Sequence, residues 1–435
     1  MKSILIKRFV LPFADIIMNT KVSYYLGLIK KISKYSKKEL KEWQLNQLHE
    51  LLNHAYHNTN YYKNLFNTHG IVPDDINRFE DLRKIPILTK KIIKDNYQDL
   101  IPTNINKINY TSASTGGSSG DPLKYLLDKN SWSFQTALNI YFWEKTSYNY
   151  GDSYLALGST SLFVNKKRSL KHEIYYWIKG KYGINGINLS DDAIKQCLDF
   201  IKNKKIKYLY GYASSLYLIA KYVEKNKINI DIKVCFPTSE VLTQVYRDTI
   251  KNVFKCEIID SYGASDGGVS AYEIIDGYYF VGYNSIVNTQ GMGKEGEDIY
   301  LVDLFNYAMP FINYEVGDAI SFSQEVDFDD YNGQYFNKIF GRTSDIIELK
   351  NGRKLTGPGF TIIFKDLPVE KYSIQKDGLN SLIINVKKTN GYKKNHEDII
   401  LSSVKNMAGE DCNISINYNN TFELSNSGKH KYIMN

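Results

Sequence analysis

The chain has 435 residues, of which 43% are hydrophobic and 23% charged, and its formal net charge is +8. This balance is typical of a globular protein and excludes the fibrous and intrinsically disordered classes. One hydrophobic core rarely grows beyond about 250 to 300 residues, so the length predicts two domains, one larger than the other. The lysine-rich stretches 30–41 and 202–207 alternate with apolar residues, as solvated faces do. We therefore expect no nucleic-acid partner.

The four cysteines lie far apart and form no Cys-x-x-Cys pair; they are Cys197, Cys235, Cys256 and Cys412. A disulfide framework or a zinc site is therefore not expected. Reduced cysteines are the rule in the cytoplasm, which is the compartment that this pattern predicts.

The first 18 residues are apolar, but Lys7, Arg8, Pro12 and Asp15 interrupt them and no small-residue cleavage site follows. No run of about 20 apolar residues occurs anywhere, so no membrane-spanning helix is expected. The simplest interpretation of this segment is a helix that packs on the body of the protein. The alternative is a peripheral contact with a membrane surface.

Helices are predicted for most of residues 1–100, where apolar side chains such as Leu45, Leu48 and Leu52 recur at a spacing of three or four. From Tyr110 onward, short apolar runs alternate with longer helical segments. Strands are predicted at 155–158, 208–211, 234–237 and 257–262, and helices at 191–203 and 215–226. This alternation predicts a layered α/β core. Between 276 and 328 the predicted strands follow one another closely, as in an antiparallel or barrel-like portion.

A different unit begins after Gly341-Arg342-Thr343-Ser344-Asp345. Its predicted elements are a hairpin that turns at Asn351-Gly352, a strand at 381–387, a helix at 395–407 and a strand at 413–418. We therefore expect an α/β protein with a large layered N-terminal domain, residues 1–341, and a small α+β C-terminal domain, residues 342–435.

A loop rich in serine, threonine and glycine lies between Thr111 and Tyr125. Its glycines let backbone N–H groups approach an anion closely, and Lys124 adds a positive charge nearby. It lacks the Gly-Lys-Ser/Thr ending of a P-loop. Taken alone, such a loop is more often a flexible turn.

Further short segments follow this loop in a characteristic order: 236–242 (FPTSEVL), 260–268 (DSYGASDGG), 314–318 (YEVGD), 341–345 (GRTSD) and 425–430 (SNSGKH). In this order they resemble the adenylate-forming superfamily. They are most similar to its phenylacetate–CoA ligase branch, which includes the CapK-type proteins of capsular polysaccharide clusters. The resemblance extends from about residue 45 to the C-terminus. It implies a large adenylation domain and a mobile C-terminal lid.

The resemblance implies that ATP binds to the serine- and glycine-rich loop and to residues of the later motifs. Its phosphates would contact Thr115, Gly117, Ser118, Ser119, Gly120 and Lys124, and the rest of the nucleotide Ser239, Glu240, Asp260, Tyr262, Gly263, Ala264, Ser265, Asp318 and Arg342. Tyr262 and Gly263 would border the adenine. Asp318 would accept hydrogen bonds from both ribose hydroxyls, a task suited to a carboxylate with two oxygens.

Three further positions receive implied roles. Asp266 would hold Mg²⁺; relatives usually have Glu there, and the shorter Asp remains a hard oxygen ligand. Ser344 lies at the hinge position, where relatives usually carry an acidic residue. Lys429 corresponds to the lysine that reaches the α-phosphate and the substrate carboxylate during adenylation.

The implied activity is ATP-dependent activation of a small carboxylic acid as an acyl-adenylate, followed by transfer to a thiol such as CoA. One alternative is an amide ligase that passes the acyl group to an amine, for example on a sugar of a surface polysaccharide. Another is a non-catalytic nucleotide-binding relative, which the departures at Asp266 and Ser344 favour and the presence of Asp318, Arg342 and Lys429 disfavours. Candidate walls of the acid pocket are the aromatic residues Trp132, Phe134, Tyr141, Phe142, Tyr210 and Tyr212.

Overall fold

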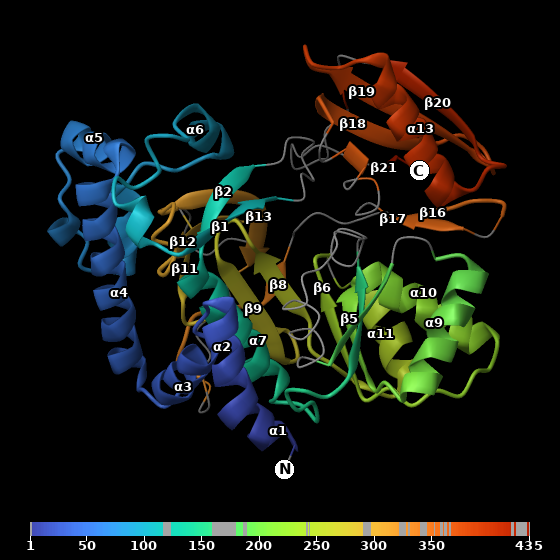
Figure 1. Cartoon of the computed structure of the whole chain (residues 1–435), viewed down its shortest axis with the longest axis horizontal. Helices are drawn as coiled ribbons and strands as arrows, with labels where there is room; N and C mark the ends of the chain where they lie inside the picture. Colours follow the sequence, from blue (N-terminus) through green and yellow to red (C-terminus); the bar gives the residue numbers. More distant parts are fainter. Residues whose placement is uncertain are drawn as a thin grey trace.

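The computed structural model describes residues 2–115, 123–158, 180–185, 189–240, 242, 244–289, 297–321, 328, 331–339, 346–351, 353–356, 360, 363–364, 367–418, 422 and 433–434. Figure 1 shows these residues as a large body of helices and sheets with a small C-terminal unit above it. The predicted α/β class with a large and a small part is confirmed.

The first hundred residues are mainly helical, as predicted: α1 (Lys2–Leu5), α2 (Leu11–Met18), α3 (Val22–Ile32), α4 (Lys37–Asn58), α5 (Asn60–His69) and α6 (Lys90–Asp95). A π-helical turn, Ile6–Val10, joins α1 to α2. Helix α4 begins at a capping box, in which Ser36 Oγ accepts from the N–H of Glu39 and the Glu39 carboxylate accepts from the N–H of Ser36. None of the described helices is long and apolar enough to cross a membrane.

The central sheet has the order β14-β10-β9-β8-β6-β5-β3-β4, with β7 also paired to β6. Its strands are β3 (Tyr154–Gly158), β4 (Lys181–Asn185), β5 (Tyr208–Tyr212), β6 (Val234–Thr238), β7 (Glu257–Ile258), β8 (Ser261–Ala264), β9 (Val269–Ile275), β10 (Tyr278–Val281) and β14 (Tyr335–Phe336). Strands β4, β3, β5, β6 and β8 are parallel neighbours, and β8, β9, β10 and β14 are antiparallel.

Helices α7 (Lys129–Trp143), α9 (Asp191–Lys204), α10 (Ala213–Lys225) and α11 (Gln244–Phe254) pack on this sheet. The predicted alternation of strands and helices is therefore confirmed. One predicted strand, 257–262, is divided into β7 and β8. The side chain of Asp260 accepts a hydrogen bond from the N–H of Ser261, which interrupts the pairing with β6 at that point.

A four-stranded antiparallel sheet contains β11 (Ser285–Thr289), β12 (Glu297–Asp303), β13 (Tyr314–Ser321) and β15 (Lys338–Ile339). This confirms the antiparallel portion predicted between 276 and 328. Strands β1 (Tyr110–Ser114) and β2 (Lys124–Asp128) form a separate hairpin. The segment before α6 is tied to β13, because Leu88 accepts from the N–H of Glu315 at 2.9 Å and donates to the carbonyl of Asn313 at 3.1 Å.

The C-terminal unit contains β16 (Ile346–Glu348), β17 (Lys354–Thr356), β18 (Val369–Lys376), β19 (Ser381–Lys388), α13 (Lys394–Ala408), β20 (Asn413–Tyr418) and β21 (Ile433–Met434). Its sheet has the order β20-β19-β18-β21, and its apolar cluster draws only on residues between Ile347 and Ile416. The predicted hairpin, strands and helix are confirmed. Strands β18 and β21 were not predicted, because charged and polar residues interrupt the apolar pattern of β18 and β21 is very short.

Candidate active site

Two hydrogen bonds between tyrosine and aspartate side chains join β8 to β13 in opposite directions. The hydroxyl of Tyr262, on β8, donates to Oδ2 of Asp318, on β13, at 2.9 Å. The hydroxyl of Tyr314, at the start of β13, donates to Oδ2 of Asp266, in the turn after β8, at 2.6 Å. We call these two contacts the tyrosine–aspartate clasp. Because both tyrosines are buried, the clasp fixes two carboxylates at the junction of the two large sheets.

The turn that carries Asp266 is held by close packing against β12. A Cβ atom added at Gly267 would lie 2.5 Å from the Leu301 side chain, and one at Gly268 would lie 1.9 Å from Asp303 Oδ2. Gly268 also has a φ of +65°, which favours glycine. The glycine pair after Asp266 is therefore required by the approach of β12, and it sets the depth at which the carboxylate lies.

The hairpin β1–β2 lies beside the clasp. Burial and the negative charges of Asp266 and Asp303 raise the pKa of Tyr125, which lies on β2. At the end of the hairpin, Thr115 Oγ1 accepts from the N–H of Leu123 at 2.9 Å, and the backbone of the same two residues pairs again at 2.9 Å. These bonds close the two ends of the serine- and glycine-rich loop, and Lys124 is exposed next to them.

Strand β8, which pairs with β6 and β9, exposes one of its faces next to the clasp. Gly263 and Ser265 are exposed, whereas Tyr262 and Ala264 are buried between them. A Cβ atom added at Gly263 would meet nothing within 4 Å. This alternation leaves free space over the backbone of Gly263, directly beside the Tyr262–Asp318 contact.

Ser239 and Glu240 lie at the carboxyl end of β6. Ser239 has a φ of +67°, an uncommon backbone conformation for a residue other than glycine. Glu240 Oε2 accepts from the N–H of Ser214 at 2.8 Å, while Oε1 is buried without a hydrogen-bond partner among the described residues. Burial raises the pKa of Glu240 to about 7. The structure thus places a weakly acidic, incompletely satisfied carboxyl group at this strand end.

Asp260 is the most deeply buried of the described residues predicted to contact the nucleotide, with an exposed fraction of 2%. Its Oδ2 accepts from the Tyr279 hydroxyl at 2.6 Å and its Oδ1 accepts from the N–H of Ser261 at 2.9 Å. Burial raises the pKa of Asp260 to about 7, against the opposing effect of the Tyr279 hydrogen bond. We therefore expect Asp260 to hold β8 and β10 in place rather than to touch a nucleotide.

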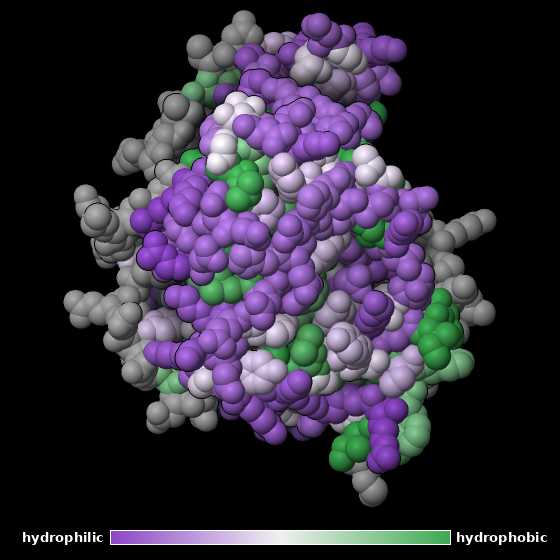
Figure 2. All heavy atoms as spheres, turned by 90° about the vertical axis from the view of Figure 1, so that its left-hand side faces the viewer, coloured by the Kyte–Doolittle hydropathy of each residue, from purple (hydrophilic) through white to green (hydrophobic). Residues whose placement is uncertain are grey.

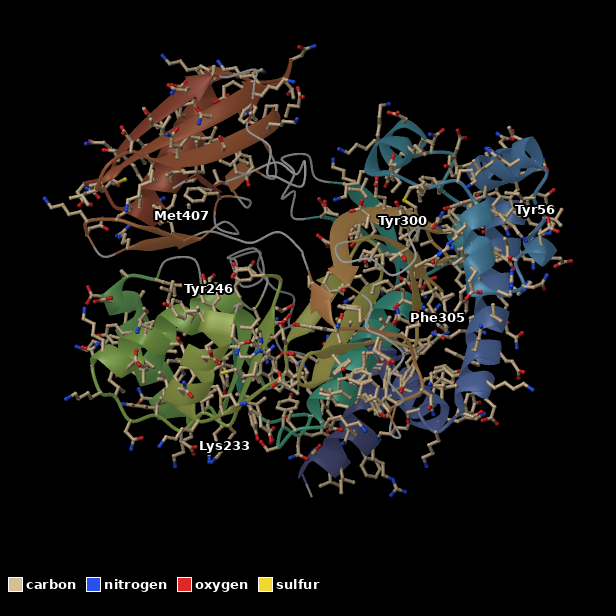
Figure 3. All side chains as sticks on the ribbon, turned by 180° about the vertical axis from the view of Figure 1, so that it is seen from behind. Tyr56, Lys233, Tyr246, Tyr300, Phe305 and Met407 are labelled. Atoms are coloured by element: carbon tan, nitrogen blue, oxygen red, sulfur yellow. The ribbon has the colours of Figure 1, made fainter. Side chains whose placement is uncertain are left out.

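The carboxyl ends of the parallel strands point toward the C-terminal unit. Lys233, just before β6, lies at the lower edge of the body in Figure 3, and Tyr246, which follows β6, lies at the upper edge. Met407, on α13, lies above Tyr246 in the same view. In open α/β sheets ligands bind outside the carboxyl ends of the strands, which is the edge that the small unit faces here.

Several predicted site residues lie outside the described residues: Gly117, Ser118, Ser119, Gly120, Arg342, Ser344 and Lys429. The remaining positions are described, and the clasp brings Tyr262, Asp266 and Asp318 together. Tyr314 was not assigned a role from the sequence. Its place four residues before Asp318, in the same short motif, is the signal that could have indicated it.

Two of the aromatic residues considered as pocket walls belong to the core instead. Phe142 stacks on Tyr272 with ring centroids 4.4 Å apart, and Phe134 contacts Tyr25 and Phe305 at 4.9 and 4.8 Å. Both Phe134 and Phe142 are fully buried. Their rings are covered by other protein rings, so we expect them to support a pocket without contacting an acid.

The described residues contain no group of three or more His, Cys, Asp or Glu side chains arranged to hold a metal ion. Mg²⁺ in nucleotide-using enzymes is commonly held by one or two carboxylates together with substrate phosphates. The buried carboxylate of Asp266 fits that mode, because Tyr314 orients it through one oxygen and a carboxylate has further lone pairs to offer. A cage made only of protein ligands does not fit.

Comparison with known proteins supports the resemblance seen in the motifs. Residues 347–435 match the family model of the CapK C-terminal domain. The chain is 20% identical to protein CapK of Staphylococcus aureus over 419 residues, which cover 95% of this chain and 92% of that protein. It is 26% identical to a phenylacetate–coenzyme A ligase of Aromatoleum evansii over 316 residues, which cover 67% of this chain and 68% of the ligase.

Among solved structures, the fold is similar to that of 2-hydroxyisobutyryl-CoA ligase in its postadenylation state, with a TM-score of 0.60. The match covers 93% of this chain and 91% of the ligase, at 13% sequence identity. Residues 347–435 thus match the CapK C-terminal domain family, and the whole chain resembles the phenylacetate–CoA ligase-like branch of the adenylate-forming ligases, as its motifs predicted.

Proposed function

We propose that this protein uses ATP to activate a carboxylic acid as an acyl-adenylate and then transfers the acyl group to a thiol such as CoA. The observation that carries the proposal is the tyrosine–aspartate clasp. It holds Asp266 and Asp318 close to the loop hairpin and to the open backbone of Gly263. A nucleotide needs this combination of a flat open surface, a ribose acceptor and a group near its phosphates.

In the proposed complex the adenine lies over Gly263, beside the ring of Tyr262, and the ribose hydroxyls donate to Asp318. The Tyr262 hydroxyl uses only one lone pair of Asp318 Oδ2, so both carboxylate oxygens remain able to accept. The hydroxyl in turn fixes the direction in which the carboxylate faces. The loop between Thr115 and Leu123 supplies N–H groups to the β- and γ-phosphates.

Adenylation requires a substrate carboxylate oxygen to attack the α-phosphorus of ATP while the bond to pyrophosphate breaks. Mg²⁺ bound at Asp266 would offset negative charge on the phosphates. We propose that Lys429 supplies a second positive charge, close to both the α-phosphate and the attacking carboxylate. Preorganised charges of this kind stabilise a transition state because they need no rearrangement as the charge develops.

Thiol transfer requires a second arrangement, because the thiol must reach the carbonyl carbon of the adenylate as AMP leaves. We propose that residues 342–435 rotate about Ser344 between the two half-reactions. Two observations support this proposal. The C-terminal unit has an apolar core of its own, and 2-hydroxyisobutyryl-CoA ligase has been crystallised both in a postadenylation state and, with CoA, in a thioesterification state.

Exchange of labelled pyrophosphate into ATP, measured with a panel of carboxylic acids, tests adenylation directly. Exchange that depends on one class of acid is the expected result. No exchange with any acid in a folded protein that binds ATP would favour a non-catalytic nucleotide-binding relative.

A second measurement identifies the acceptor. CoA or an amino sugar is added to the active acid, and release of AMP and formation of thioester or amide are followed by mass spectrometry. A thioester is expected. An amide on the amino sugar would instead favour the surface-polysaccharide alternative, for which the resemblance to CapK across most of the chain is the supporting observation.

A further inference from the structure

The N-terminal helical segment, Lys2–Met18, presents a stripe of large apolar side chains to solvent. Its members recur at intervals of three or four residues from Leu5: Leu5, Phe9, Phe13, Ile16 and Ile17. The exposed fraction reaches 61% for Phe9, 64% for Phe13 and 79% for Ile16. Single exposed apolar residues are ordinary on protein surfaces, whereas a contiguous patch marks a binding surface.

The stripe does not arise from a detached helix, because the opposite face of the segment is docked. Leu11 and Ala14 are buried, and the ammonium group of Lys7 lies 2.7 Å from a carboxylate oxygen of Glu144. Asp15 accepts hydrogen bonds from the N–H groups of Val22 and Ser23 at 2.9 and 2.7 Å. The segment is therefore apolar on both sides, and the body covers only one of them.

Figure 2 shows apolar side chains at the surface near the N-terminal segment. Green side chains gather at the lower right of this view, where the N-terminal segment protrudes, whereas most of the surrounding surface is purple. A protruding apolar surface next to polar side chains is typical of helices that lie in a membrane–water boundary.

Two groups of exposed lysines lie on other elements of the body. Three of them, Lys30, Lys31 and Lys34, lie at the end of α3, the helix that follows the stripe. A second group lies at the ends of α9, α10 and α11 and the starts of β5 and β6: Lys205, Lys207, Lys227, Lys233 and Lys255.

The figures place the elements that carry the stripe and the first group, and Lys233 of the second group, on one side of the body. In Figure 1, α1, α2 and α3 lie along the lower side of the body, and in Figure 3 Lys233 lies at that same lower side. Asp231 pairs with Lys207 and Lys233 at 3.1 Å each, which leaves the second group with a net positive charge.

We propose that this lower side binds a membrane surface rich in anionic lipid. The apolar stripe would enter the boundary between headgroups and acyl chains, and the flanking lysines would attract the anionic headgroups. A second copy of the chain presents the same positive charge and would be repelled, so charge complementarity favours the lipid surface. The C-terminal unit lies on the opposite side of the body (Figure 1), so a bound protein would keep its candidate active site accessible from water.

Sedimentation with vesicles tests this proposal with the full chain. Vesicles of one quarter phosphatidylglycerol and three quarters phosphatidylcholine should bind the protein, and raised salt should weaken the binding. The triple variant F9S/F13S/I16S should bind at least about tenfold less, because three apolar side chains no longer insert. The matched control V72S/L379S/I399S changes three exposed apolar residues elsewhere and should bind like the parent.

A triple lysine variant and its matched control test the electrostatic part of the proposal. K30Q/K31Q/K34Q should weaken binding to the anionic vesicles several-fold and leave unfolding temperature unchanged, since the three side chains are exposed. The control K350Q/K393Q/K394Q changes exposed lysines of the C-terminal unit and should have little effect.

Two results would overturn the proposal. One is failure of the parent protein to sediment with the anionic vesicles at low salt. The other is concentration-dependent dimerisation, measured by analytical ultracentrifugation, that F9S/F13S/I16S abolishes while vesicle binding is equal in the parent and the variant. That second result would assign the stripe to a second copy of the chain.

Discussion

The clasp between β8 and β13 differs from the C-terminal unit in how its charged side chains are held. In the clasp, buried tyrosine hydroxyls hold Asp266 and Asp318 at 2.6 and 2.9 Å, so the carboxylates are fixed by the packing of two sheets. The C-terminal unit packs an apolar core of its own, and its charged groups lie at the surface, as in the pair Lys387–Glu370. Groups that must keep one position are thus built into the body, and the unit proposed to move is self-contained.

The largest expected effect comes from the proposed moving unit. Lys429→Ala should lower adenylation by at least about a hundredfold, as expected for the loss of one preorganised charge near a transition state. Thioester formation from pre-made acyl-adenylate should suffer far less, because the lysine would have rotated away. Single-turnover assays of each half-reaction measure both effects.

Lys431→Ala is the matched control for Lys429→Ala, since it removes a lysine two residues away. Equal damage to both half-reactions by Lys429→Ala would contradict the role proposed for Lys429. A hundredfold loss of adenylation in Lys431→Ala, with Lys429→Ala intact, would transfer the role to Lys431.

A smaller effect is expected on the fixed side of the comparison. Asp318→Ala should weaken ATP binding by about 2 kcal/mol or more, because two charge-assisted hydrogen bonds to the ribose would be lost. Isothermal titration with ATP measures this change, and Asp298→Ala, at an exposed position on β12, is the control. Unchanged ATP affinity in folded Asp318→Ala would remove Asp318 from the site.

Substitution of Asp266, the other carboxylate of the clasp, should change the Mg²⁺ dependence of activity. Asp266→Asn should raise the Mg²⁺ concentration needed for half-maximal activity by about tenfold, because a neutral amide is a weaker ligand than a carboxylate. Tyr314→Phe should raise it less, since it removes only the hydroxyl that orients the carboxylate. The same Mg²⁺ dependence in Asp266→Asn and the parent would show that Asp266 is not the ligand.

The smallest expected effect is a difference between the two regions in how their contribution to stability depends on pH. Burial raises the pKa of Asp303, the last residue of β12 in the body, to about 7. The folded state therefore binds the proton more tightly than the unfolded state, whose carboxyl has its ordinary pKa near 4. The free energy of unfolding should consequently fall as pH rises from about 4 to about 7, with no further change above.

The contribution of Asp411, in the C-terminal unit, to stability changes with pH in the opposite direction. A hydrogen bond from Asn351 lowers the pKa of this exposed carboxyl, so its small contribution to stability is present near neutral pH and is lost on acidification. Thermal unfolding between pH 3 and pH 8 tests the comparison. In Asp303→Asn the fall in unfolding temperature above pH 5 should be a few degrees smaller than in the parent. A pH profile identical to that of the control Asp377→Asn would contradict the role of Asp303.

Local patterns were enough to predict most helices and strands, because hydrophobic periodicity and turn residues act over a few neighbours. Helix α9 and strands β5, β6 and β20 lie within a residue or two of their predicted bounds. The order of short motifs also led to the prediction of Asp266 and Asp318 as site residues. Strand β18 escaped prediction, because its mixed residues become a strand only through pairing with β19.

Tertiary structure alone decided which of these residues act together. The clasp joins residues 56 and 48 positions apart, from two different sheets, and no local pattern encodes such a contact. The same holds for Asp260, whose place in a nucleotide motif gave no sign that Tyr279 would bury it. The N-terminal segment shows the converse: it has apolar side chains on more than one face, and only docking of Leu11 and Ala14 determines that Phe9, Phe13 and Ile16 remain in solvent. Sequence patterns indicate local conformational preference, whereas the burial of a side chain depends on which segments, distant in the sequence, pack against it.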